Sequence, residues 1–187
     1  MLSRSSSVSF VLGISPLRRA RCPSERLTCE FHERDYRFMN LALEQAKLAY
    51  DEGEVPVGCV LVSEDGEILS MGRNRVHNKM DCTCHAEMEC LRSAMATANN
   101  WRLLGSVIYC TLEPCLMCLG AIQLARVAKL KYGADDLRMG AVHSWISVPS
   151  VKHPFHEVKI SGGLLAAESS NLLRQFFRQQ RTEGRTE

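Results

Sequence analysis

Two short stretches of the sequence carry side chains that zinc prefers as ligands. The first, CHAEMEC, contains His85 and, two residues later, Glu87. The second, EPCLMC, contains a pair of thiols three residues apart, Cys115 and Cys118. Thiolate and imidazole are common zinc ligands, and C-x-x-C is a usual spacing for two thiolates on one ion. We therefore predict that His85, Cys115 and Cys118 bind one zinc ion.

Glu87 is predicted to move protons rather than to bind the metal. On a helix, residues i and i+2 do not share a face, so Glu87 is poorly placed to ligate the same ion as His85. A carboxylate beside a zinc-activated water can take a proton from it and return that proton to a leaving amine. The pattern thus indicates three protein ligands and a fourth coordination position left for chemistry.

Another thiol could instead close the site and make it a structural zinc centre. Cys90 lies off the helical face of His85, Cys110 belongs to an apolar strand, and the side chain of Cys84 should diverge from its neighbour. Cys82 remains the strongest alternative ligand. Nine cysteines, an odd number, in a chain of 187 residues favour a reducing compartment over a disulfide scaffold.

The apolar patterns predict the elements that position these side chains. A helical period runs from Asp35 to Asp51, and Gly53 is placed to end that helix. The other expected helices are residues 85–98, 115–127 and 164–181, and the expected strands are residues 55–62, 67–72, 106–112 and 129–134. Strands that alternate with helices after an opening hairpin indicate an α/β sandwich, in which helices cover a mixed sheet.

Residues 1–32 differ in composition from the rest of the chain. They contain five arginines and many serines, with no acidic residue before Glu25. This composition is typical of an organellar transit peptide, and the serines favour a chloroplast over a mitochondrion. The alternative is a basic tail that stays attached and helps to hold RNA. Residues 33–187 are then expected to form one domain, long enough to bury a core.

The distribution of charge along the chain limits how it can bind nucleic acid. The formal net charge is +2, of which residues 1–32 carry +3 and the remainder about −1. Any contact with nucleic acid must therefore come from local basic patches. No window approaches the roughly 18 uninterrupted apolar residues of a membrane-spanning helix, so no membrane association is expected.

The motif H-x-E followed by P-C-x-x-C is the signature of zinc-dependent nucleobase deaminases. Here it reads His85-Ala86-Glu87 and, from Pro114 onwards, PCLMC. The blocks EVPVGCVLV, GRNRVHN, TLEPCLMCLGAI, YGADD and LLRQFFRQQR resemble those of the bacterial-type tRNA adenosine deaminase family, in that family's order. The similarity covers about residues 35–183. It implies a three-layer α/β/α sandwich of the cytidine-deaminase-like type, with a mixed five-stranded sheet, and a homodimer.

The resemblance also implies a reaction. It is the hydrolytic deamination of adenosine to inosine at the wobble position of a tRNA anticodon stem-loop, with tRNA-Arg as the expected substrate. His85, Cys115 and Cys118 correspond to the family's zinc ligands. Glu87 corresponds to the proton shuttle that activates the zinc hydroxide nucleophile.

Three further residues correspond to substrate-binding positions of the family. Asn74 matches an asparagine that contacts the flipped nucleotide, and its amide offers both a donor and an acceptor. Val57 matches an apolar pocket wall, and Asp136 matches a loop residue near the sugar–phosphate path. From residue type alone, these three could equally be a turn residue, a core residue and a solvated loop residue.

The sequence departs from the family pattern in three places. The residues before His85 are CTC, where the family has PTA. His143 stands where glycine is expected, and we expect it to pack on the surface rather than to alter RNA contacts. Gln179 and Gln180 replace arginines in the last helix, which weakens one phosphate-binding patch. The basic residues that remain there are Arg174, Arg178 and Arg181.

Two other functions stay open at this point. A cytidine, deoxycytidylate or guanine deaminase acting on small molecules needs the same metal site. The last helix, rich in arginine and phenylalanine, favours RNA over a free nucleotide. A catalytically silent zinc protein that binds RNA would not need Glu87, so the presence of this residue favours an enzyme.

Overall fold

The computed structural model describes residues 31–151, 153–182 and 184. The predicted leader, residues 1–32, lies almost entirely outside these described residues, so its prediction is not tested by the structure. Within the described part of the chain, no helix is long and apolar enough to cross a lipid bilayer.

A mixed sheet of five strands forms the centre of the domain, in the order β2-β1-β3-β4-β5. β1 pairs antiparallel with β2 and with β3, whereas the β3–β4 and β4–β5 pairs are parallel. This confirms the expected mixed five-stranded sheet. The strands are β1 (Gly58–Val62), β2 (Ile68–Arg73), β3 (Val107–Leu112), β4 (Lys129–Ala134) and β5 (Lys159–Ser161).

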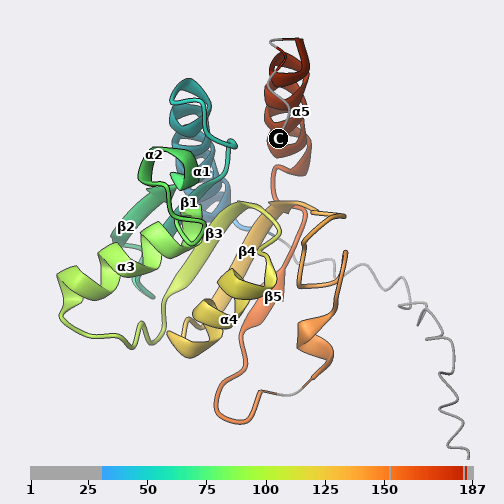
Figure 1. The fold of residues 1–187 in the computed structure, drawn as a ribbon. Helices are drawn as coiled ribbons and strands as arrows, with labels where there is room; N and C mark the ends of the chain where they lie inside the picture. The colour runs from blue at the N-terminus through green and yellow to red at the C-terminus, as the bar shows by residue number, and fades with distance from the viewer. Residues whose placement is uncertain (1–30, 152, 183, 185–187) are drawn as a thin grey trace, which may run out of the picture.

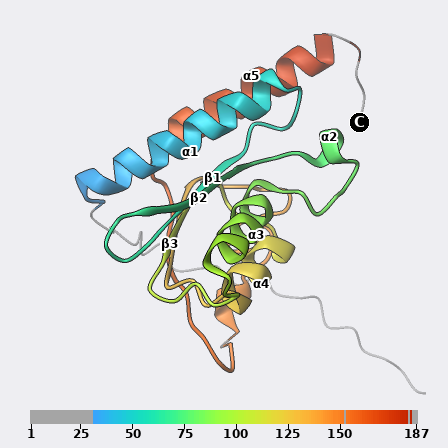
Figure 2. The ribbon, with the colours of Figure 1, turned by 90° about the vertical axis from the view of Figure 1, so that its left-hand side faces the viewer.

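Helices cover both faces of this sheet, as Figures 1 and 2 show. α1 (Glu33–Asp51) and α5 (Ala166–Thr182) lie side by side on one face. α3 (Ala86–Ala98) and α4 (Leu116–Leu124) lie on the other. A short helix, α2 (Val76–Lys79), follows β2, and a single 3-10 turn spans Val148–Ser150. The domain is therefore the three-layer α/β/α sandwich that the resemblance implies.

The core divides into two clusters because the sheet is buried on both faces. One cluster joins the sheet to α3 and α4, and the other joins it to α1. All five residues of β1 are buried, which explains why its sequence is an apolar run rather than an alternating pattern.

A predicted helix end is most accurate where one residue in the sequence terminates the helix. α1 ends as expected at Gly53, which adopts a left-handed φ of +77°. The Glu54 N–H then donates to the Ala49 carbonyl, which is the closing bond of a Schellman motif.

Two predicted boundaries are wrong at one end. The strand expected at residues 55–62 begins only at Gly58, and the helix expected at residues 115–127 ends at Leu124. The apolar pattern continues to Val127 because the turn after α4 is itself buried, with Val127 fully shielded and Arg126 at a left-handed φ of +64°. Over so few residues, a buried turn and a buried helix give the same run of apolar residues, so the pattern does not distinguish them.

Candidate metal centre and substrate cavity

Two of the predicted ligands occupy equivalent positions at the starts of facing helices. His85 is the N-cap residue of α3, and Cys115 is the N-cap residue of α4. Cys118 lies in the first turn of α4 and is completely buried. The positive end of a helix dipole favours thiolate over thiol, so α4 stabilises the charged form of both sulfurs.

The distances between the three side chains match a tetrahedral zinc site. The His85 Nδ1 atom lies 3.6 Å from the Cys115 Sγ atom and 3.6 Å from the Cys118 Sγ atom. A tetrahedral ion with Zn–N of about 2.05 Å and Zn–S of about 2.3 Å requires an N···S separation of about 3.6 Å. The tertiary structure therefore brings the predicted ligands together at the spacing that zinc needs.

The protonation of the thiol pair also suits a divalent cation. Contact with Cys118, helped by the His85 imidazole, lowers the pKa of Cys115 to about 4. The same contact, together with burial, raises the pKa of Cys118. The Cys115 thiol therefore ionises readily, and the negative charge of its thiolate opposes ionisation of the Cys118 thiol. A dication between the sulfurs removes this repulsion, so the donor set fits zinc.

Glu87 lies beside the ligand group without belonging to it. One of the two groups of potential metal ligands among the described residues consists of His85, Cys115 and Cys118, with all donor atoms within 4.8 Å of one another. Glu87 follows in the first turn of α3, where only 4% of its surface is exposed. Burial raises the pKa of Glu87. A carboxyl group of raised pKa can take up and return a proton near neutral pH.

A cavity of about 600 Å³ opens above this group. Val57, Asn74 and Asp136, the three predicted substrate-binding residues, all line this cavity together with Glu87. Val57 also belongs to the core cluster, so its two interpretations are compatible. The volume is in the usual range for a small-molecule site. Further lining residues include Val55, Val76, His77, Leu112, Arg138, Met139, Leu173 and Phe177.

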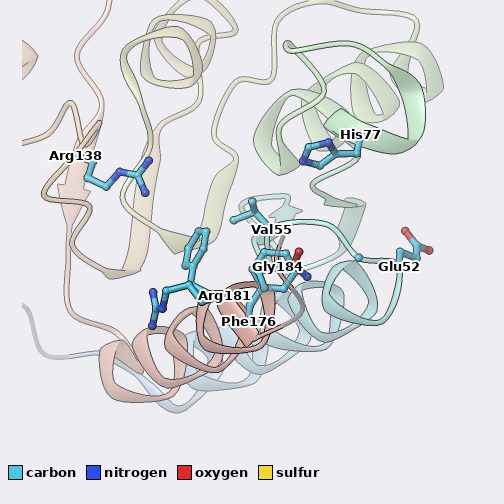
Figure 3. Close-up of a pocket in the computed structure, with 10 residues that line it drawn as sticks. Glu52, Val55, His77, Arg138, Phe176, Arg181 and Gly184 are labelled. Atoms are coloured by element: carbon cyan, nitrogen blue, oxygen red, sulfur yellow. The ribbon is translucent and has the colours of Figure 1, made fainter. Parts of the chain in front are cut away.

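A second cavity, of about 740 Å³, adjoins the first (Figure 3). The two share lining residues on both sides, among them His77 and Arg138, which face each other across the opening in Figure 3. Phe176 and Arg181 reach into it from α5. Neither His77 nor Arg138 was predicted to contact the substrate. His77 lies in the block GRNRVHN and Arg138 in the loop after β4, and only the fold places the two together.

The loop after β4 is held by Glu113, a residue that the sequence analysis missed. Its Oε2 atom accepts the Asp136 N–H at 3.0 Å, and its Oε1 atom accepts three more backbone N–H groups at 2.8–3.1 Å. The loop passes so close that a Cβ atom at Gly140 would lie 2.3 Å from Glu113. The donors on Oε1 are Val142, His143 and Ser144.

These contacts stabilise Glu113 as a carboxylate. Burial by itself would raise its pKa, but hydrogen bonds from the 136–144 loop outweigh burial and lower the pKa. The only signal in the sequence is the position of Glu113, two residues before a metal ligand. Nothing local indicates that its partners lie 23–31 residues further on.

His143, the histidine that departs from the family pattern, lies outside the cavity. Its side chain is 47% exposed, and its Nδ1 atom is 3.0 Å from the Tyr132 hydroxyl. It is not among the residues that line either cavity. This agrees with the expectation that it packs on the surface.

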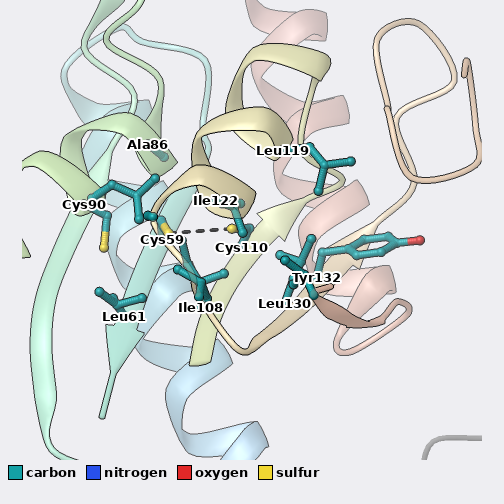
Figure 4. Packing of buried hydrophobic residues seen from close by; sticks show 14 of the residues in the cluster. Cys59, Leu61, Ala86, Cys90, Ile108, Cys110, Leu119, Ile122, Leu130 and Tyr132 are labelled. Atoms are coloured by element: carbon teal, nitrogen blue, oxygen red, sulfur yellow. Dashed lines mark hydrogen bonds between the residues drawn. The ribbon is translucent and has the colours of Figure 1, made fainter. Parts of the chain in front are cut away.

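The remaining described thiols lie away from the ligand group, so the described residues provide no fourth cysteine ligand. Cys82 is exposed, and the Cys84 thiol donates to Asp81 at 3.3 Å. Cys59 and Cys110 face each other in the core, with sulfurs 3.6 Å apart (Figure 4). The alternative of a closed structural centre therefore finds no support.

Comparison with known proteins agrees with this geometry. Residues 32–134 match the family model for the cytidine and deoxycytidylate deaminase zinc-binding region. Together, the sandwich, the His/Cys/Cys group and this match define a zinc-dependent deaminase of the cytidine-deaminase-like class.

Similarity to individual proteins of that class identifies a narrower family. The chain is 41% identical over 144 residues to the tRNA-specific adenosine deaminase of Streptococcus pyogenes serotype M1, covering 77% of this chain and 84% of that protein. It is 43% identical over 156 residues to the chloroplastic tRNA(adenine(34)) deaminase of Arabidopsis thaliana, covering 75% of this chain and 12% of that protein.

A solved structure from studies of A-to-I editing by tRNA:A34 deaminases matches with a TM-score of 0.70 and 40% identity. That match covers 73% of this chain and 98% of the solved chain. The chain belongs to the family of tRNA-specific adenosine deaminases.

Proposed function

We propose that this protein deaminates adenosine to inosine at the wobble position of tRNA, with zinc as its cofactor. One observation carries the proposal: the cavity lined by His85, Cys115 and Glu87 adjoins a second cavity whose lining includes basic and aromatic side chains. A free nucleoside needs only the first cavity. A polynucleotide needs room for the nucleotides on either side of the target, so the arrangement favours RNA over a small-molecule substrate.

The chemistry requires one water molecule and releases ammonia. His85, Cys115 and Cys118 would hold the zinc ion, which would supply a water of lowered pKa for attack at neutral pH. Glu87 takes a proton from the attacking water and delivers it to the amino group as the C–N bond breaks. The burial of Glu87 excludes bulk water from this transfer.

The other cavity residues would bind the nucleotide. Val57 provides an apolar surface for the purine, and Asn74 provides hydrogen bonds from its amide. Asp136 acts on its own loop as well, because its Oδ1 atom accepts the N–H groups of Arg138 and Met139. It therefore shapes the turn that presents Arg138 to the substrate.

The second cavity would hold neighbouring nucleotides of the anticodon loop. Arg138 and Arg181 can contact phosphates, and the ring of Phe177 can stack on an unpaired base. These contacts suit a single-stranded loop, since a duplex does not expose base faces for stacking.

We also propose a homodimer that forms through α4 and the loop after β4. A bridge between Cys115 and Gly140 places this loop beside the start of α4. Both segments expose large apolar side chains, which an interface with a second copy would cover. The exposed residues are Leu116, Met117 and Leu124 on α4 and Met139, Trp145 and Ile146 in the loop.

A plastid location is proposed from two observations. Residues 1–32 have the serine- and arginine-rich composition of a transit peptide. A relative from Arabidopsis thaliana is described as chloroplastic. By resemblance to the bacterial-type enzymes, the proposed substrate is a tRNA-Arg that carries adenosine at the wobble position.

The proposed function is tested with stem-loop substrates. We expect the zinc-loaded protein to form inosine in an anticodon stem-loop of tRNA-Arg with adenosine at the wobble position. The matched control, with that adenosine moved to the neighbouring position, should stay unmodified. Free cytidine, adenosine and guanine are assayed in parallel. Deamination of cytidine or guanine without inosine in the stem-loop would contradict the proposal.

A further inference from the structure

Glu54 is a buried carboxylate outside both cavities. Its exposed fraction is 0%, and no lysine, arginine or histidine in the described part of the chain forms an ion pair with it. Burying a carboxylate without a cation is costly unless its oxygens are well hydrogen-bonded. Glu54 lies in the turn that ends α1, where its N–H donates to the Ala49 carbonyl.

Two hydrogen bonds connect Glu54 to the substrate cavity. Its Oε2 atom accepts the Asn74 Nδ2 group at 3.0 Å, and its Oε1 atom accepts the Asn78 N–H at 2.8 Å. Asn74 lines the cavity, and Asn78 belongs to α2, whose Val76 and His77 also line it. Because Glu54 itself lines neither cavity, any effect on the substrate must pass through these partners.

The bond to Asn74 determines which end of its amide meets the substrate. Both carboxyl oxygens of Glu54 accept hydrogen bonds, Oε2 from Asn74 and Oε1 from Asn78, so the Asn74 NH₂ group points toward Glu54. The Asn74 Oδ1 atom is then at the opposite end. Within the described residues it has no hydrogen-bond partner, and it is not among the polar atoms shielded from solvent. Its open side is the cavity that Asn74 lines.

An oxygen in this position selects a donor on the substrate. The ring nitrogens of adenine are acceptors, and its amino group must lie at the metal for the reaction. The donors that remain on adenosine are its ribose hydroxyls, and the 2′-hydroxyl distinguishes RNA from DNA.

We propose that Glu54 is a specificity-determining positioning residue, which fixes the Asn74 amide so that its carbonyl oxygen receives the 2′-hydroxyl of the target nucleotide. This inference rests on the proposed function. It assigns Glu54 a role in choosing RNA over DNA, although the residue never touches the substrate.

Glu54→Gln tests the inference without changing the size of the side chain. The Gln Oε1 atom can still accept the Asn78 N–H, but its NH₂ group now faces Asn74. The Asn74 amide must then turn over and present NH₂ to the cavity instead of oxygen. We expect kcat/KM on the stem-loop to fall by about 10- to 100-fold, with zinc content and melting temperature nearly unchanged.

The double variant Glu54→Gln with Asn74→Asp should rescue activity. The Gln NH₂ group donates to one carboxylate oxygen of the new Asp, and the other oxygen again faces the cavity. We expect kcat/KM to recover by about tenfold relative to Glu54→Gln alone. Asp35→Asn is the matched control: it also replaces a buried carboxylate by an amide, but on the α1 face of the sheet. It should lower stability and leave kcat/KM of the folded protein unchanged.

A stem-loop with 2′-deoxyadenosine at the target position identifies the substrate group. The wild type should lose about tenfold in kcat/KM on this substrate, whereas Glu54→Gln should lose little, because the hydrogen bond is already absent. A Glu54→Gln variant with wild-type kcat/KM and wild-type sensitivity to the 2′-deoxy change would overturn the inference.

The orientation of the amide can be measured without substrate. In ¹⁵N spectra of the zinc-loaded protein, the Asn74 NH₂ protons should show slow exchange that Glu54→Gln abolishes. If this holds while the wild type forms no inosine, the proposed function fails but the orienting role of Glu54 stands. If the Asn74 signal is the same in both proteins, the inference itself is wrong.

Discussion

At the scale of single residues, the metal ligands and the predicted proton carrier occupy different positions at the starts of two helices. His85 and Cys115 are N-cap residues that border the cavity, while Glu87 follows in the first turn of α3 and is 4% exposed. The ligands need an opening for substrate, whereas a proton carrier benefits from a site that excludes bulk water. Because Glu87 lies outside the ligand group, its removal should affect turnover and not metal binding.

Glu87→Gln tests this separation of roles. We expect about one zinc ion per chain to be retained and turnover on the stem-loop to fall by about 10²- to 10⁴-fold, the usual contribution of a general acid–base. Glu89→Gln is the control on the same helix, because Glu89 pairs with Lys79 and lines neither cavity. Loss of zinc from Glu87→Gln, measured by elemental analysis, would show that Glu87 is a ligand.

At the scale of elements, buried carboxylates hold segments in place. Glu113 gathers the loop after β4 by its backbone N–H groups, and Asp35 fastens the start of α1 to the sheet. Asp35 accepts hydrogen bonds from the Tyr109 hydroxyl at 2.7 Å and from Lys131 on β4 at 2.6 Å. It also accepts the N–H of His32, which completes a capping box at the first turn.

The Asp35 contacts should make stability depend on pH. Burial would raise the pKa of Asp35, but the hydrogen bonds from Lys131 and Tyr109 outweigh it and lower the pKa. The stabilisation is therefore complete above the unfolded value of about 3.9 and is lost as pH falls through the lower folded value. We expect Asp35→Asn to lose about 2–4 kcal/mol at pH 7.

Denaturant unfolding of wild type and Asp35→Asn between pH 7 and pH 3 measures this difference. The difference in the free energy of unfolding between the two proteins should be constant near neutral pH and should become smaller below about pH 4. If this difference in unfolding free energy stays the same down to pH 3, the charge of Asp35 contributes nothing to stability.

At the scale of the whole molecule, α4 and the loop after β4 form one of several regions that expose large apolar side chains. Met139 of this loop also lines the substrate cavity. A second copy on this surface would thus border the cavity. The proposed homodimer would then complete the edge of the site as well as cover apolar side chains.

Leu116→Glu should convert the proposed dimer to a monomer, because it would introduce a charge into the proposed apolar interface. Leu48→Glu is the control, since Leu48 is 44% exposed on α1 and Leu116 is 48% exposed on α4. Light scattering coupled to gel filtration measures the mass of each. A dimeric Leu116→Glu protein would place the interface elsewhere.

Most elements were predictable because their signals are local. The helical period of α1, its end at Gly53 and the apolar runs of β1, β3 and β4 need only neighbouring residues for their interpretation. β5 and α2 were missed because three or four residues are too few to show a period. The ends of α4 and β1 were misplaced because burial extends an apolar pattern beyond the element itself.

By itself, the sequence determined the zinc donors and the class of reaction, and it predicted a proton carrier. H-x-E and P-C-x-x-C are sufficient for this because ligand type and spacing along one helix turn are local properties. Only the tertiary structure decided how Glu54 orients Asn74, how Glu113 holds a loop, and that His77 and Arg138 face each other. Those pairs join segments 20 to 30 or more residues apart. Contacts at that separation depend on sheet order and helix packing, which no local pattern records.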